Sequence, residues 1–501
     1  MPAITKLESL PTDWNLGATV DAARPGNLFP SGVGFHAARA DTENFVHSVE
    51  ALIRRGIAVR PLEIVRVPKA DRSTRPAADM PVTDQLIYQA IVNTIKSHVY
   101  PGLVSFTTGN GDIEYTRFED FPLSQDNVAY VLMADAASFY EYVDHDLLSY
   151  EILGSTGDTD VTEALIQSLQ EWMQAPRGLP QGPLASGPLA DIYISPVARA
   201  MSRSGFRFSR YSDDFRVVAE NWTGARQAQL ALETAMRVAG LSLAPGKLWT
   251  PRIATYRSQL EGIRREREST PLNWADEAAT VAGYGGEEAT FLEVSEDEKT
   301  TAEATTLRIL DTEKGGLTNT RLLRWALPRL AFSGSTLPLQ RLNLLLRRYG
   351  ELTQATAAYI RVLLQLSDPD DALKAVTDWF SAASFRYPWQ IGWIFHATCF
   401  SPKKSTNIAR LAKLALLDGT VPWFLRAQAA ISLAVHGALP PQTEFVGIYE
   451  LSPDASRPDF IAAVLIGDPP WAKAFLTGVA TSPLERAALH LDGADYQQWL
   501  R

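Results

Sequence analysis

The fold of this chain is decided by the stretch FRFSRYSDDFRVVAE, residues 206–220. Two short runs of β-forming residues are joined there through Ser212, Asp213 and Asp214, and this pattern predicts a β-hairpin with acidic residues at its tip. An Asp-Asp pair in a turn also has an ordinary explanation, because turns favour aspartate for backbone reasons. The neighbouring segments therefore decide whether these carboxylates belong to a site.

A further acidic residue ends an apolar run upstream of this hairpin. The run VAYVLMADA, residues 128–136, has β character and reaches Asp135, and apolar residues at helical spacing follow in residues 139–153. Carboxylates at strand ends can converge on hard divalent cations, because Mg²⁺ prefers oxygen ligands and shares its coordination shell with substrate phosphates. Two such ions can activate an attacking 3′-hydroxyl and stabilise a leaving pyrophosphate.

A glycine-containing loop lies between the two acidic positions. It reads RGLPQGPLAS, residues 177–186, and runs into an apolar helical stretch. Gly178 and Gly182 allow the backbone to approach a ligand closely, and Gln181 offers both a hydrogen-bond donor and an acceptor. The loop is therefore a candidate for contact with a bound substrate.

Basic residues flank these segments on both sides. Lys69 and Arg75 stand in the turn-rich stretch VPKADRSTRPAADM, residues 67–80, where basic side chains can clamp a triphosphate. Lys247 ends the stretch GLSLAPGK, residues 240–247. A lysine in such a position is equally well explained as a surface residue.

Taken in order, these motifs resemble those of reverse transcriptases. The series is PK…RP…D, D-x-x-x-F-Y, G-L-P-Q-G-x-x-x-S, Y-x-D-D and G-L-x-L-x-x-x-K, within residues 67–247. The resemblance covers residues 50–265, which correspond to the fingers and palm of a right-hand polymerase. It implies an RNA-directed DNA polymerase, a DNA nucleotidyltransferase, and does not extend to the C-terminal half.

The resemblance implies a metal-binding role for the aspartates. Asp135 corresponds to the first catalytic aspartate of the family, with the Ala136 carbonyl as a further metal contact. Asp213 and Asp214 correspond to the paired aspartates of the Y-x-D-D hairpin, of which Asp213 is expected to be the direct ligand. Because three clustered carboxylates repel one another without cations, two Mg²⁺ ions are expected, with Mn²⁺ able to substitute.

Tyr140 matches the position of the family's steric gate. An aromatic ring there would press against a ribose 2′-hydroxyl and so select deoxynucleoside triphosphates as substrates. The ordinary alternative is an aromatic residue of the core.

The resemblance assigns roles to the other matched residues as well. Lys69 and Arg75 match the fingers pair that neutralises the incoming triphosphate. Gln181 and Gly182 match the loop that supports template and nucleotide. Lys247 matches a lysine that protonates the departing pyrophosphate.

The chain changes character towards its C-terminus. Nine acidic residues and one lysine between Asp276 and Glu303 carry most of the net charge of -10, and we interpret residues 266–305 as an acidic linker or insertion. Residues 306–501 are expected to be all-α, because apolar residues recur three and four apart. The helical segments are residues 317–332, 337–352, 357–366, 372–380, 407–417 and 423–437.

Two architectures fit this helical half, a HEAT-like stack of helical hairpins or an irregular bundle. Ser482 to Glu485 has the form of a capping box with Pro483 at the first helical position. The expected fold class is therefore α+β, with fingers and palm in residues 1–265 followed by the helical domain.

Cysteine content and hydropathy exclude several classes. A single cysteine, Cys399, excludes a disulfide framework and a zinc-bound endonuclease module. Since there is neither a signal-peptide pattern nor a long apolar run, a cytoplasmic location without a membrane partner is expected.

A reverse-transcriptase core followed by a long helical half resembles the bacterial abortive-infection and related defence-associated enzymes, which act against bacteriophage. That resemblance implies antiviral defence, synthesis without a conventional template, priming from a protein hydroxyl, and a homo-oligomer. The expected partners are deoxynucleoside triphosphates, a DNA product, and an RNA template or companion non-coding RNA.

Two other functions stay open. One is a templated retron- or intron-type reverse transcriptase that copies a dedicated RNA. The other is a helical-repeat scaffold or sensor in which polymerisation is incidental.

Overall fold

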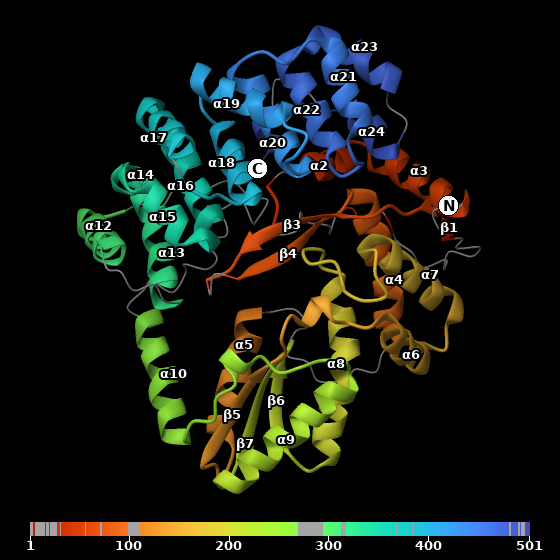
Figure 1. The fold of residues 1–501 in the computed structure, drawn as a ribbon, viewed down its shortest axis with the longest axis vertical. Coiled ribbons are helices and arrows are strands. Elements are labelled where there is room, and N and C mark those ends of the chain that lie inside the picture. Colours follow the sequence, from red (N-terminus) through yellow and green to blue (C-terminus); the bar gives the residue numbers. More distant parts are fainter. Residues whose placement is uncertain are drawn as a thin grey trace. The chain divides into compact units, whose positions relative to one another are not determined.

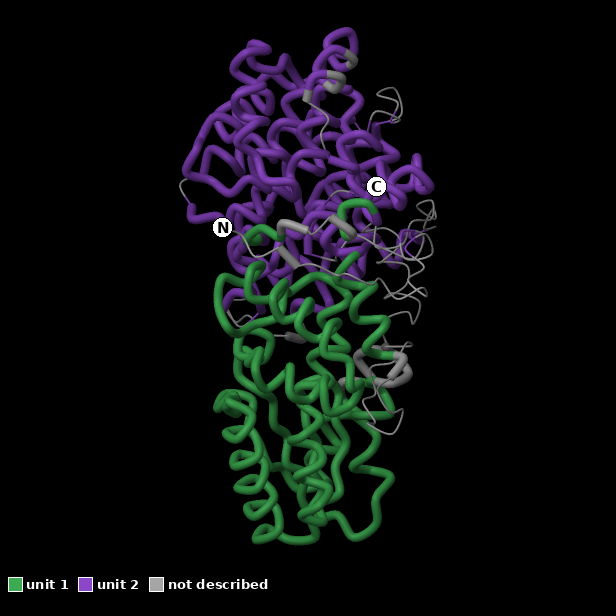
Figure 2. The backbone as a smooth tube through the Cα atoms, turned by 90° about the vertical axis from the view of Figure 1, so that its right-hand side faces the viewer, with its two compact units in different colours: residues 1–15, 51–62, 87–271 green, residues 16–50, 63–86, 272–501 purple. Residues whose placement is uncertain are grey.

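The computed structural model describes residues 4–5, 16, 20, 28–30, 32–55, 57–70, 73–98, 111–268, 294–311, 317–366, 368–382, 384–479, 482–488, 491 and 496–500. The chain divides into two compact units (Figure 2). Unit 1 contains residues 1–15, 51–62 and 87–271, and unit 2 contains residues 16–50, 63–86 and 272–501. The units thus interleave along the chain, and the expected boundaries at residues 265 and 305 stay a prediction.

Unit 1 is built on a three-stranded antiparallel sheet in the order β5-β7-β6. Its strands are β5 (Tyr130–Asp135), β6 (Arg207–Tyr211) and β7 (Asp214–Ala219). The expected strand before Asp135 and the expected hairpin are thereby confirmed. The hairpin tip consists of Ser212 and Asp213, because Tyr211 pairs with Asp214.

Helices cover this sheet (Figure 1). The helices α8 (Ser186–Arg203) and α9 (Trp222–Val238) pack on the strands and on each other. The helix α10 (Ile253–Glu268) packs on β5, where Tyr256 and Leu260 contact Val131. The other elements of unit 1 are β1 (Ile4–Thr5), β2 (Ile57–Ala58), α5 (Gly111–Asp120), η1 (Phe121–Ser124), η2 (Phe139–Glu141), α6 (His145–Thr156), α7 (Thr159–Met173) and η3 (Pro245–Lys247).

Unit 2 combines a β-hairpin with helices. The hairpin consists of β3 (Glu63–Pro68) and β4 (Thr74–Asp79). The helix α2 (Val33–Ala40) precedes it in the chain. The helices α3 (Thr42–Arg55) and α4 (Val82–His98) each contain residues of both units. Every element described from Glu296 onward is a helix. These helices are α12 (Glu296–Asp311), α13 (Leu317–Phe332), α14 (Leu337–Gln340), α15 (Leu342–Arg348), η4 (Gly350–Leu352), α16 (Thr353–Leu366), α17 (Pro369–Ser381), α18 (Pro388–Thr398), α19 (Thr406–Leu417), α20 (Trp423–His436), α21 (Gln442–Leu451), α22 (Arg457–Gly467), α23 (Pro469–Val479), α24 (Pro483–Ala488) and α25 (Tyr496–Trp499).

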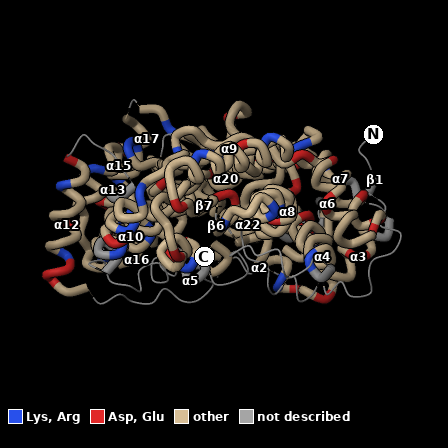
Figure 3. Tube along the Cα trace, turned by 90° about the horizontal axis from the view of Figure 1, so that it is seen from below, with Lys and Arg blue, Asp and Glu red and all other residues tan. Residues whose placement is uncertain are grey.

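The end of the acidic segment is helical. Residues 269–293 lie outside the described residues, but the acidic residues from Glu296 onward lie on α12, which carries charges of both signs (Figure 3). The Glu298 carboxylate lies 3.7 Å from the buried guanidinium of Arg329 on α13. The Glu303 carboxylate accepts a hydrogen bond of 2.6 Å from Ser335. This part of the expected linker therefore packs as an element of unit 2.

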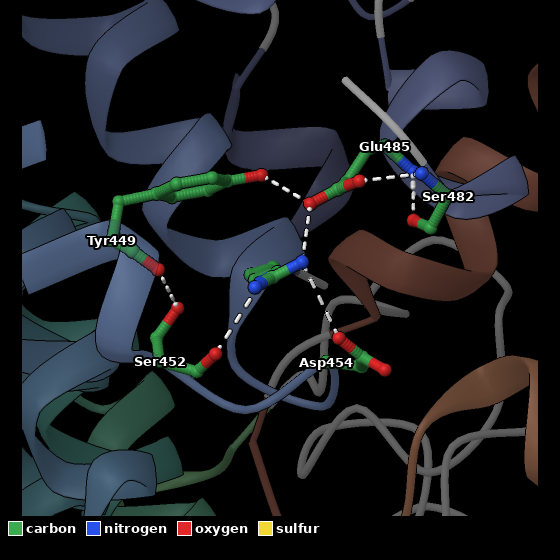
Figure 4. Close-up of polar contacts among 6 residues, drawn as sticks. Tyr449, Ser452, Asp454, Ser482 and Glu485 are labelled. Carbon is green, nitrogen blue, oxygen red and sulfur yellow. Dashed lines mark hydrogen bonds and ion pairs between the residues drawn. The ribbon is translucent and has the colours of Figure 1, made fainter. Parts of the chain in front are cut away.

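The expected capping box at the start of α24 is confirmed (Figure 4). The Ser482 N–H donates to Glu485 Oε2 at 2.6 Å, and the Glu485 N–H donates to Ser482 Oγ at 3.2 Å. The other oxygen of Glu485 accepts hydrogen bonds from the Tyr449 hydroxyl at 2.5 Å and from Arg457 at 3.0 Å. This buried carboxylate thus joins α24 to α21 and α22, with its charge balanced by Arg457.

In the part of the chain that the structure describes, no helix is long and apolar enough to cross a bilayer. Cys399 is a buried free thiol. Burial raises the pKa of that thiol, which keeps it protonated and unreactive at neutral pH.

Candidate active site

The tip of the β6–β7 hairpin is held by a buried arginine. Ser212 adopts a left-handed backbone conformation with φ of 52°, which is unfavourable for a residue with a side chain. The Arg210 guanidinium, only 3% exposed, donates to the Ser212 carbonyl at 2.6 Å and to Asp191 on α8 at 2.8 Å. This double contact stabilises the tight turn, so the two carboxylates that follow have fixed positions.

Sheet register brings the three predicted aspartates together. Asp135 at the end of β5 pairs directly with Asp214 at the start of β7, and Asp213 precedes Asp214 at the tip. Burial, followed by the charge of Asp135, raises the pKa of Asp213. Burial also raises the pKa of Asp214, although Arg216 at 3.5 Å partly opposes this effect. The cluster therefore holds more negative charge than its protein neighbours neutralise.

Lys247 reaches the same cluster by backbone pairing. The segment after α9 runs back along β5, since the Ala137 N–H donates to the Ser242 carbonyl and the Ala244 N–H to the Asp135 carbonyl, each at 2.8 Å. This places η3 beside the strand end, where the Lys247 ammonium contacts Asp135 Oδ2. Burial lowers the pKa of Lys247, but the neighbouring carboxylates, Asp135 first, outweigh this and raise it.

The donor atoms of this cluster suit a hard divalent cation. Among the described residues, no group of three or more His, Cys, Asp or Glu side chains is arranged to hold a metal ion. Lys247 contacts one oxygen of Asp135. The other oxygen, Asp135 Oδ1, is buried without a hydrogen-bond partner among those residues. Oxygen ligands and uncompensated negative charge are what Mg²⁺ and Mn²⁺ favour. The chemistry of the site therefore fits such an ion.

The predicted steric gate and the glycine-containing loop are joined by backbone hydrogen bonds. Tyr140 lies half-buried in η2, directly after β5, with its ring 5.7 Å from that of Phe139. The Leu179 N–H donates to the Tyr140 carbonyl at 2.8 Å, and the Gly178 N–H donates to the Val143 carbonyl at 2.7 Å. Because Gly178 has φ of 98°, this close approach depends on glycine.

Two further side chains position the loop: His145, which belongs to none of the sequence motifs, and Ser186, the last residue of the G-L-P-Q-G-x-x-x-S motif. His145 is fully buried, and its Nε2 lies 2.8 Å from the Gly178 carbonyl. Burial lowers the pKa of His145, so the neutral ring donates this hydrogen bond at neutral pH. The Ser186 hydroxyl donates to the Pro180 carbonyl at 2.6 Å and lies 3.0 Å from the Tyr88 hydroxyl. The contacts of His145 with Gly178 and of Ser186 with Tyr88 join residues 33 and 98 positions apart, which no local pattern marks.

Gln181 and Gly182 form the middle of this loop. Both are half-buried, and Gly182 has φ of 130°, another conformation that favours glycine. The helix α8 begins four residues later, at Ser186. The loop is thus fixed at both ends and presents these two residues between its anchors.

Replacing Gly178 by alanine should destabilise the protein. The new Cβ would lie 3.2 Å from Met173 Cε and 3.6 Å from the Glu141 carbonyl, on a backbone that alanine rarely adopts. We expect the free energy of unfolding to fall by about 1–3 kcal/mol, measured by urea denaturation. Gly154 in α6 is the control, because its Cβ would meet no atom within 4 Å and alanine there should stabilise the helix. Equal changes in the free energy of unfolding for Gly178→Ala and Gly154→Ala would contradict the backbone strain expected at position 178.

Lys69 and Arg75 lie on the β3–β4 hairpin of unit 2, whereas the aspartates belong to unit 1. The Lys69 N–H donates to the Ser73 carbonyl at 2.9 Å and closes the turn. Arg75 is exposed and pairs with Val67 across the hairpin. The two basic residues therefore share one short structural element, which the turn-rich sequence did not indicate.

Three of the four arginines in residues 199–210 lie close to carboxylates. Arg199 lies 2.7 Å from Glu151, Arg207 lies 3.9 Å from Glu220, and Arg210 is bound to Asp191. The charges of these three arginines have acidic partners within unit 1, so the run of basic residues by itself does not indicate phosphate binding.

Comparison with known proteins identifies part of the chain. Residues 67–252 match the family model described as reverse transcriptase (RNA-dependent DNA polymerase). The match identifies a reverse transcriptase domain, an RNA-directed DNA polymerase, in that segment and contains all ten predicted site residues from Lys69 to Lys247. No curated protein matches the chain.

Among solved structures, the chain is similar to that of telomerase from Candida albicans in complex with a fragment of telomeric RNA. The identity is 10% and the TM-score 0.30, with 68% of this chain covered. The alignment spans 64% of the telomerase chain.

Proposed function

We propose that the protein is a DNA polymerase of the reverse transcriptase type, which transfers deoxynucleotides to a 3′-hydroxyl or to a protein hydroxyl. The observation that carries this proposal is the pairing of Asp135 with Asp214, beside Asp213, inside the segment that matches the family. Three carboxylates that share uncompensated charge are suited to holding two divalent cations.

In this proposal each residue has a defined task. Asp135, Asp213 and Asp214, with the Ala136 carbonyl, bind two Mg²⁺ ions, for which Mn²⁺ can substitute. When bound, the ions lower the pKa of the attacking hydroxyl and neutralise charge on the phosphates. Lys247 holds a proton at its Nζ atom beside Asp135 and donates it to the leaving pyrophosphate.

The remaining residues bind and select the nucleotide. Lys69 and Arg75 neutralise its triphosphate. Gln181 and Gly182 support the nucleotide and the template through the loop that His145 and Ser186 anchor. Tyr140 excludes the 2′-hydroxyl of ribonucleotides from the site.

The biological role that we propose is antiphage defence by abortive infection, in the bacterial cytoplasm and as a homo-oligomer. In this role the enzyme extends DNA without a conventional template, and it primes from a hydroxyl of the protein. The long helical half supports this proposal, and its helices are proposed to form a HEAT-like array. A templated reverse transcriptase with a dedicated RNA, or a scaffold with incidental polymerisation, would give other results in the same assay.

The decisive assay uses purified protein, Mg²⁺ and each labelled deoxynucleotide, without added nucleic acid. We expect a product that is sensitive to DNase and shifts on protease treatment, and that is absent from the Asp213→Ala/Asp214→Ala variant. Product that appears only with an RNA template and primer would favour the templated enzyme. No product under either condition, with the phage-related phenotype intact in that variant, would favour the scaffold.

A further inference from the structure

The hairpin that carries Lys69 and Arg75 is held by the C-terminal helices of unit 2. The first residue of its strand β3, Glu63, lies at the N-terminus of α20. One carboxylate oxygen of Glu63 accepts a hydrogen bond of 2.8 Å from the Trp423 N–H, and the other accepts one of 2.9 Å from the Phe424 N–H. A residue 360 positions away in sequence thus caps this helix.

The helix needs this distant cap because its own sequence does not supply one. The residue before the helix is Pro422, which has no side-chain hydrogen-bond acceptor, and no side-chain cap is formed there. The first N–H groups of a helix have no partners within the helix, and they favour a negative charge. The Glu63 carboxylate satisfies two of these groups at once and provides that charge.

Glu63 and its neighbour Asp79 form a carboxylate pair at the start of the hairpin. Burial raises the pKa of Glu63 above its ordinary value, and the two backbone N–H groups and Arg426 on α20 limit this rise. Asp79 pairs with Glu63 across the hairpin. Burial, and then the charges of Glu63 and Asp459, raise the pKa of Asp79 to about 8, so it is largely protonated at neutral pH. Of the two carboxylates, Glu63 is the one whose oxygens face the N–H groups of the helix.

The far end of β3 also contacts the helical half. Pro68, the last residue of the strand, packs on Gly350 in η4, where a Cβ would lie 3.1 Å from Pro68 Cγ. The strand also packs against α18. Both ends of the strand that leads into Lys69 are thus fixed by residues beyond position 340.

We propose that Glu63 is a positioning residue for nucleotide binding, which acts by anchoring the hairpin of Lys69 and Arg75 to α20. In this view the helical half is part of the apparatus that binds the nucleoside triphosphate, because it determines where the two cations of the hairpin stand. The inference rests on the proposed function and adds a role for the C-terminal helices.

The kinetic test compares Glu63→Ala and the milder Glu63→Gln with the wild-type full-length chain. We expect the KM for the deoxynucleotide to rise about tenfold in Glu63→Ala, the size expected for one lost helix cap, with kcat within about twofold. The KM of Glu63→Gln should lie between the KM of the wild-type chain and that of Glu63→Ala, since the amide oxygen of glutamine keeps one of the two hydrogen bonds. Glu444→Gln is the control, because this exposed residue of the first turn of α21 is a comparable acid away from the hairpin. An unchanged KM in Glu63→Ala would overturn the proposal.

A double-mutant cycle tests whether Glu63 acts through the hairpin. In a Lys69→Ala/Arg75→Ala background, the effect of Glu63→Ala on KM should shrink to less than about threefold, because both positioned cations are then absent. Full additivity of the two effects would overturn the proposed route.

A measurement without nucleotide separates the anchor from the enzymatic proposal. Amide hydrogen exchange at Val65 and Val67 in β3 should become at least about tenfold faster in Glu63→Ala, and unchanged exchange would overturn the anchor. If the wild-type chain incorporates no nucleotide, the proposed function fails, whereas the exchange result still decides whether Glu63 anchors the hairpin.

Discussion

Replacing Asp213 by asparagine should reduce deoxynucleotide incorporation at least about 10³-fold and at the same time increase thermal stability. The loss follows because a carboxylate ligand of the proposed cations disappears, and such charge stabilisation is worth several kcal/mol in the transition state. The stability gain follows because Asp213 is buried beside Asp135, which raises its pKa. Asparagine keeps the shape of the side chain and removes one of the repelling charges.

The stability gain should depend on pH in a defined direction. The pKa of Asp213 in the folded protein is raised above its ordinary value of 3.8, so the folded state binds more protons than the unfolded state above that pH. The stability contributed by this carboxyl group therefore falls as pH rises from about 3.8, its ordinary pKa, to about 7, its pKa in the folded protein. The gain from Asp213→Asn should accordingly be larger at pH 8 than at pH 5 in thermal unfolding without divalent cations.

Asp126→Asn is the matched control for both measurements. Asp126 is an exposed carboxylate in the turn before β5, and its replacement should change neither incorporation nor the pH dependence of stability. Mg²⁺ should raise the melting temperature of the wild-type protein and of this control more than that of Asp213→Asn. Retained incorporation in Asp213→Asn would refute the assignment of the site.

The second large effect concerns the choice of sugar. Replacing Tyr140 by valine should lower discrimination against ribonucleotides by about 10²-fold, because the ring that opposes the 2′-hydroxyl is removed. The measurement is the ratio of kcat/KM for a deoxynucleotide to that for the matching ribonucleotide. The kcat/KM for the deoxynucleotide itself should change much less than the ratio of the two kcat/KM values.

Tyr142→Val provides the comparison for Tyr140. Tyr142 lies two residues further along, is 46% exposed and has the Arg177 guanidinium 5.1 Å from its ring centre. Its loss should leave the sugar ratio unchanged, although it removes an aromatic ring from the same segment. An unchanged ratio in Tyr140→Val would remove that residue from the gate role.

The parts of the fold that were predictable from sequence are those with local patterns. The strands around Ser212 and before Asp135 were predicted because each is a short β-forming run that ends at a turn. The helical segments predicted in the C-terminal half from apolar residues three and four apart are helical, except that residues 337–352 are interrupted at Arg341 and Tyr349. The helices α18, α21, α22 and α23 were not predicted as separate segments. The α+β class is confirmed, and the HEAT-like arrangement stays a prediction.

The candidate site was predictable as a set of residues but not as an arrangement. Asp135 faces Asp214 because of the sheet register, which depends on long-range pairing and not on the motifs themselves. His145 was missed because its contact with Gly178 joins residues 33 positions apart that no spacing rule connects. The β3–β4 strands were missed because Pro68 and Pro76 made the stretch look like a turn, although proline is tolerated at strand ends and edges.

The cap that Glu63 places on α20 sets an order of events during biosynthesis. Strand β3 leaves the ribosome long before Trp423 and Phe424 have been added, since 360 residues separate the partners. At ordinary elongation rates this delay is on the order of tens of seconds, during which the first strand of the hairpin has no helix to cap. A nascent or prematurely terminated chain that ends before position 423 would contain the entire aspartate cluster and still have an unanchored hairpin. Under the role proposed for Glu63, nucleotide binding of full strength would thus appear only after Trp423 and Phe424 have been translated.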